Sequence, residues 1–69
     1  MANAVRQVRV GSLGFGDLFR TYATRRWGKV YGHVPDVGTG VKIADKLADV
    51  PAAPLCFIHP DVWVEHVGN

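Results

Sequence analysis

The sequence contains very little cysteine, since Cys56 is the only one in 69 residues. A single thiol excludes a disulfide within the chain. A protein of this size must then draw its stability from apolar packing, with self-association as a further source. Cys56 stands in a short run of apolar residues, 55–58, where a free cysteine behaves as a small hydrophobe. We therefore expect Cys56 to be buried.

Long hydrophobic runs are also absent. No stretch approaches the roughly 20 apolar residues of a membrane span, and the first residues lack the apolar core of a secretory signal peptide. We therefore expect a cytoplasmic protein with no membrane partner. The composition nevertheless suits a folded core, because 48% of the residues are hydrophobic and 10% are aromatic, which makes disorder a poor explanation.

The first half of the chain has almost no acidic residues. Asp17 is the only acid in residues 1–33, against six basic residues, whereas residues 34–69 carry five acids and two lysines. The chain is therefore charge-segregated although its net charge is only +2. A basic half and an acidic half favour self-association or a protein partner, while the total charge falls short of that of a dedicated nucleic-acid binder.

The chain lacks a complete catalytic, nucleotide-binding or metal-binding motif. The glycines of residues 11–16 precede a strand pattern, whereas a phosphate-binding loop opens a helix. Cys56 and His59 form one close pair, with His66 further on, and a structural zinc site needs four ligands. A barrel of this size also leaves little room for a substrate pocket. We expect no enzyme activity, cofactor, metal or small-molecule substrate.

What the chain does contain is a series of short segments with the alternating pattern of β-strands. Gly28 and Gly32 predict a strongly bent strand. Residues 44–50 have helical composition, and Pro51 is expected to end that turn. The expected class is all-β: a small barrel or rolled antiparallel sheet with at most one short helical turn, folded as a single domain over residues 1–69. Its five to six strands are expected at residues 5–10, 18–22, 27–34, 41–43, 55–58 and 62–67.

Three short motifs have the turn and strand-start signals of a known class: residues 16–19 (GDLF), 27–30 (WGKV) and 59–61 (HPD). With the order of elements over most of the chain, they resemble the SH3-like small β-barrels, in which a long first loop leads into a hairpin-rich sheet. In that first loop, Leu13 and Phe15 are expected to fold back onto the core. The chain also resembles small accessory proteins of bacteriophages, which implies a modulator of a host protein.

The most suggestive group of side chains is basic and aromatic. If residues 18–22 and 27–33 form a hairpin, Arg20 and Tyr22 share one face, with Lys29 and Tyr31 across from them. Cations on such a face contact phosphates while its aromatic rings stack on bases. The alternative is that Trp27 and one tyrosine pack in the core and the arginines are only solvated. The predicted partner-binding residues are Arg20, Tyr22, Arg25, Arg26, Trp27, Lys29 and Tyr31.

A second aromatic segment lies near the C-terminus. Trp63 is expected on the opposite face from Val62 and Val64, so that one face joins the core and the other forms an exposed edge. Arginine and tryptophan are enriched at interface hot spots. We therefore predict a non-enzymatic binding module that engages a protein partner or a second copy of itself. The alternative is a nucleic-acid-binding barrel that uses the basic aromatic face.

Overall fold

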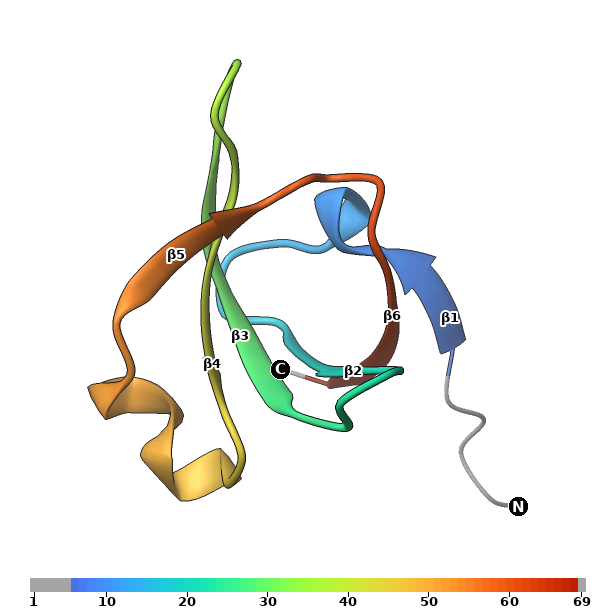
Figure 1. Ribbon diagram of the computed structural model, residues 1–69. Helices are drawn as coiled ribbons and strands as arrows, with labels where there is room; N and C mark the ends of the chain where they lie inside the picture. Colours follow the sequence, from blue (N-terminus) through green and yellow to red (C-terminus); the bar gives the residue numbers. More distant parts are fainter. Residues whose placement is uncertain (1–5, 69) are drawn as a thin grey trace.

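The computed structural model describes residues 6–68, which form a rolled β-sheet (Figure 1). These residues contain no α-helix, and the predicted all-β class is confirmed. Val5, the first residue of the first predicted strand, lies outside the described range. The strands are β1 (Arg6–Arg9), β2 (Leu18–Thr21), β3 (Trp27–Val34), β4 (Gly38–Ala44), β5 (Leu55–Ile58) and β6 (Trp63–Gly68), and the 3-10 turns are η1 (Val10–Ser12) and η2 (Leu47–Ala52).

All six strands of the described range belong to one antiparallel sheet in the order β1-β6-β2-β3-β4-β5. The sheet curls so that the β3–β4 hairpin faces β6 across the interior, and the tip of that hairpin projects beyond the roll (Figure 1). The two edge strands, β1 and β5, do not pair with each other. This arrangement is a small all-β domain compatible with an SH3-like fold.

The core lies inside the roll, because each strand turns every second side chain inward. The buried cluster consists of Val10, Leu13, Phe19, Val30, Val41 and Val64. Leu13 confirms that the first loop folds back onto the core. The same expectation is wrong for Phe15, which is 75% exposed and instead meets the ring of Tyr31 edge-on at 5.9 Å between centroids. Of the prediction that Trp63 lies opposite Val62 and Val64, the part for Val64 is confirmed, since Trp63 is exposed and Val64 is buried; Val62 precedes β6 and is 40% exposed.

The glycines inside β3 mark the bend that was predicted there. The register between β3 and β4 shifts between Val30 and Gly32. Gly28 pairs directly with Phe19 on β2, and a Cβ atom at Gly28 would overlap the Phe19 ring. The missing side chain at Gly28 therefore makes room for the largest residue of the core.

Two local expectations need correction. Cys56 is exposed, because β5 is an edge strand and its four residues receive little cover. The helical turn occupies Leu47–Ala52, with Pro51 inside it instead of ending it. A short 3-10 turn tolerates proline because few of its residues need to donate a backbone N–H. No helix in the described part of the chain is long and apolar enough to cross a membrane.

Candidate functional site

The predicted hairpin of β2 and β3 forms, and it brings part of the predicted basic aromatic face together. Arg20 and Trp27 are direct partners across the two strands, and the guanidinium carbon of Arg20 lies 4.6 Å from the centroid of the Trp27 ring. The Nη2 atom of Arg20 also donates to the carbonyl of Arg25 at 2.8 Å. Trp27 is half-buried and stands outside the core cluster. Arg20 is therefore fixed by its own hairpin.

Two further arginines of this face are paired with acids from the second half of the chain. Arg25 Nη1 donates to Glu65 Oε1 at 2.9 Å, and Arg26 Nε lies 2.9 Å from Asp45 Oδ1. The hydrogen bond from Arg25 holds the pKa of Glu65 below its ordinary value, and the same bond raises the pKa of Arg25. Folding thus brings the two oppositely charged halves of the sequence into contact, and two predicted phosphate-binding cations have internal partners.

The pairing of Arg25 with Glu65 predicts a pH-dependent stability. Because the pKa of Glu65 is lowered by folding, the pair stabilises the folded state above the ordinary glutamate pKa, and this contribution disappears as the pH falls through the folded-state pKa. We expect Glu65→Gln to be less stable than the wild type at neutral pH and equally stable in strong acid. Urea unfolding followed by tryptophan fluorescence measures both differences. A difference of the same size at both pH values would contradict the prediction.

The other predicted residues lie on either side of this cluster. Tyr22 is in the turn after β2 and is 40% exposed. Lys29 and Tyr31 continue along the outer side of β3, with the Lys29 ammonium 5.8 Å from the centroid of the Tyr31 ring. A lysine that was not predicted, Lys42 on β4, approaches the same ring to 5.1 Å. The predicted face therefore extends from the β2–β3 turn onto the outer side of the sheet.

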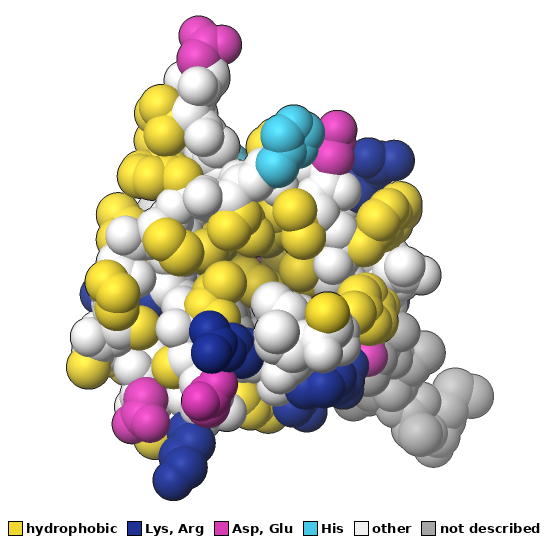
Figure 2. Space-filling view, in the orientation of Figure 1, with side chains coloured by type: hydrophobic (Ala, Val, Ile, Leu, Met, Phe, Trp, Pro, Cys, Tyr) yellow, Lys and Arg dark blue, Asp and Glu magenta, His cyan; other side chains and the backbone are white. Residues whose placement is uncertain are grey.

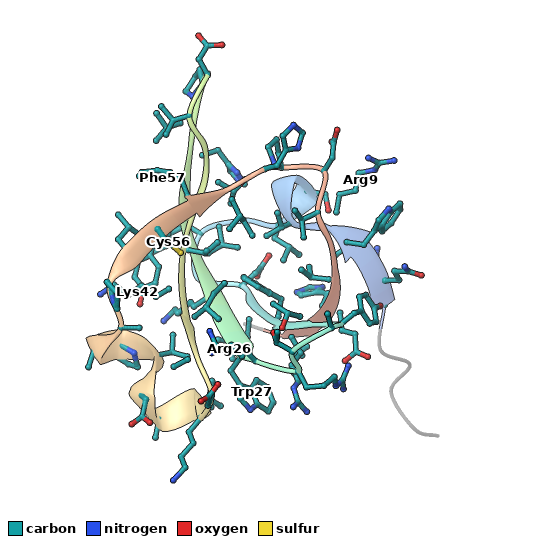
Figure 3. The ribbon with its side chains drawn as sticks, in the orientation of Figure 1. Arg9, Arg26, Trp27, Lys42, Cys56 and Phe57 are labelled. Atoms are coloured by element: carbon teal, nitrogen blue, oxygen red, sulfur yellow. The ribbon has the colours of Figure 1, made fainter. Side chains whose placement is uncertain are left out.

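The outer side of β3, β4 and β5 carries large exposed side chains, and we call this surface the outer face. Leu55 and Phe57 on β5 are 52% and 45% exposed, and they lie over Gly40 of β4. Phe57 and Lys42 project away from the interior of the roll (Figure 3). Glycines form the floor of a shallow hollow of about 100 Å³. The outer face consists of Phe15, Lys29, Tyr31, Gly32, Val34, Gly40, Lys42, Leu55 and Phe57.

Sequence reasoning missed half of this surface. Residues 55–58 are all apolar, so no alternation separated Leu55 and Phe57 from the core-facing side. The signal that was available is the pair of prolines, Pro54 and Pro60, on either side of a very short strand. Proline beside a short apolar strand is typical of a sheet edge.

A larger groove lies beside the turn end of the β3–β4 hairpin, and its volume is about 510 Å³. The expectation that so small a barrel leaves little room for a pocket is therefore wrong. Both ring nitrogens of His33 in this groove are occupied, since Nε2 donates to the carbonyl of Leu13 at 2.6 Å and Nδ1 lies 2.9 Å from the hydroxyl of Thr39. His33 thus ties the first loop to β4. The described residues contain no group of three or more side chains placed to hold a metal ion.

Comparison of the chain with family models, with curated proteins and with solved structures gave no match.

Proposed function

We propose that this chain is a non-enzymatic binding module that engages a protein partner in the cytoplasm through its outer face. The observation that carries the proposal is the exposure of Leu55 and Phe57 around a shallow hollow, with the exposed Phe15 ring against Tyr31 of the same hollow. Contiguous apolar side chains on a surface are typical of protein-binding sites. The resemblance to small accessory proteins of bacteriophages supports a host protein as the partner.

The charges favour a protein over a nucleic acid. Arg9, Arg25 and Arg26 each have a carboxylate partner, so they offer less charge to a phosphate backbone. Aliphatic side chains such as Leu55 contribute apolar contact to an interface but cannot stack on a base as an aromatic ring does. Nucleic-acid binding through the basic aromatic face remains the alternative prediction.

Replacement of Phe57 tests the proposed function. We expect Phe57→Ser to weaken partner binding about tenfold or more, because a few central aromatic residues contribute most of the binding energy of an interface. The full chain is immobilised, a lysate of its source cells or their host is passed over it, and retained protein is quantified. Trp63→Ser is the matched control, because Trp63 is an exposed aromatic on β6 and lies outside the outer face.

Two results would contradict the proposal. Equal retention by the wild type and by Phe57→Ser would exclude the outer face as the site. The nucleic-acid alternative would instead be supported if the retained material is sensitive to nuclease and is lost in Arg25→Ala and Arg26→Ala. Its retention should then decline steeply with salt, because counterion release makes phosphate contacts strongly salt-dependent.

A further inference from the structure

Two lysines of the outer face stand directly opposite each other. Lys29 on β3 and Lys42 on β4 are Cα partners in the sheet, and both ammonium groups lie near the ring of Tyr31. Like charges directly across a strand pair destabilise a sheet. Neither lysine makes an ion pair with a carboxylate of the described residues, although three arginines of the same range do.

The contacts that these lysines do make leave donors unused. The Tyr31 ring attracts both cations weakly, and Lys42 Nζ donates to the carbonyl of Pro51 at 3.0 Å. An ammonium group has three N–H donors, so each lysine keeps hydrogen-bonding capacity for a further acceptor. The row formed by Lys29 and Lys42 therefore suits an anionic group from another molecule.

The open edge of β5 lies beside this row. Lys42 pairs with Leu55, so the row runs from Lys29 through Lys42 to β5. β5 pairs with β4 alone within the described range, and alternate residues of an edge strand direct their N–H and C=O groups outward. No charged residue or proline stands within Leu55–Ile58 to protect this edge.

A strand added to this edge would be covered on both sides. Its outward side chains would lie beside Leu55 and Phe57, and its inward side chains would lie beside Cys56 and Ile58. Hydrophobic side chains also gather between β5 and β6 on the face that Figure 2 shows. A residue of the added strand opposite Leu55 would lie in line with the lysine row, and a residue two positions along that strand would lie beside Phe57.

We propose that the outer face binds an extended segment of a protein partner, which adds to β5 as a further strand. The segment directs an acidic side chain across Leu55 toward Lys42, the nearer lysine of the row, and, two positions away, an apolar side chain onto Phe57. This inference rests on the proposed function and specifies the chemistry of the partner. Backbone hydrogen bonds to β5 supply affinity, and the lysine row selects for the carboxylate.

The test uses a short capped peptide with the core Leu-Val-Glu-Val-Leu, which presents glutamate two positions from leucine in either strand direction. We expect the full chain to bind this peptide about tenfold or more tightly than the same peptide with lysine in place of glutamate. Lys42→Glu should reverse this preference, whereas Lys46→Glu, outside the outer face, should leave it unchanged. Fluorescence anisotropy of the labelled peptide measures each affinity. N-methylation of one alternate set of peptide amides should abolish binding, and methylation of the other set should be tolerated.

Five outcomes would overturn the inference. Equal binding of the glutamate and lysine peptides would remove the role of the lysine row, and insensitivity to both methylated sets would remove strand addition. A dimer that forms with rising concentration and is dissolved by Phe57→Ser would assign the face to a second copy of the chain. If a cellular partner is lost in Phe57→Ser but still binds Lys42→Glu, this inference is overturned and the proposed function stands. If the partner binds both variants as well as it binds the wild type, the inference and the proposed function are both overturned.

Discussion

Gly28→Ala is expected to remove much or all of the stability of the folded chain. The new Cβ atom would overlap the ring of Phe19, which is fully buried and is the direct partner of Gly28 across the β2–β3 pair. Expelling that ring costs about as much as deleting it, or about 3–5 kcal/mol. A domain of this length has a total stability of about 3–10 kcal/mol, so one methyl group removes much or all of it.

Urea unfolding and near-ultraviolet circular dichroism measure the loss. Gly14→Ala is the matched control, because a Cβ atom at Gly14 meets only Asp17 Oδ2 at 3.7 Å, an ordinary contact. Adding Phe19→Leu to Gly28→Ala should restore part of the stability, since a smaller side chain makes room for the new methyl group. Wild-type stability of Gly28→Ala would show that the Phe19 ring does not lie against this glycine in solution.

Two strands have the bounds that the sequence predicts, Trp27–Val34 and Leu55–Ile58. Buried and partly exposed residues alternate from Trp27 to Val30, and prolines stand close to both ends of Leu55–Ile58. The strand expected at residues 41–43 begins earlier in the structure, because Gly38 and Gly40 both belong to β4. Glycine has no side chain to show which face it takes, so hydrophobic periodicity cannot detect a strand that begins with two of them.

Only part of the candidate site could be predicted, because the exposure and ion pairing of its side chains depend on contacts between distant segments of the chain. The glutamate that neutralises Arg25 stands 40 residues further along the chain, so the local charge excess was visible and its compensation was not. The exposure of Cys56 and Phe57 follows from the position of β5 at the end of the sheet. Strand order is a tertiary property, and an apolar run has the same sequence at an edge as in the middle of a sheet.

Gly38→Ala is expected to loosen β5 and to abolish binding at the outer face. Gly38 has a φ of +135°, which L-residues rarely adopt, and a Cβ atom there would lie 2.6 Å from the carbonyl oxygen of Ile58. Backbone strain alone costs about 1–3 kcal/mol, and relief of the clash requires Ile58 to move away from β4. Because β5 is held by β4 alone within the described range, we expect the damage to concentrate in this edge strand.

Gly32→Ala is the control that separates backbone strain from the steric clash with Ile58. Gly32 has a φ of +152°, but no atom lies within 4 Å of a Cβ atom placed there. Amide hydrogen exchange should show faster opening of β5 in Gly38→Ala than in Gly32→Ala, with β2 and β6 protected in both. Equal exchange of β5 in the two variants would mean that the Ile58 carbonyl does not constrain Gly38. Since β5 supplies Leu55, Phe57 and the open edge, a variant that frees β5 while the core strands hold would separate the binding surface from the fold that supports it.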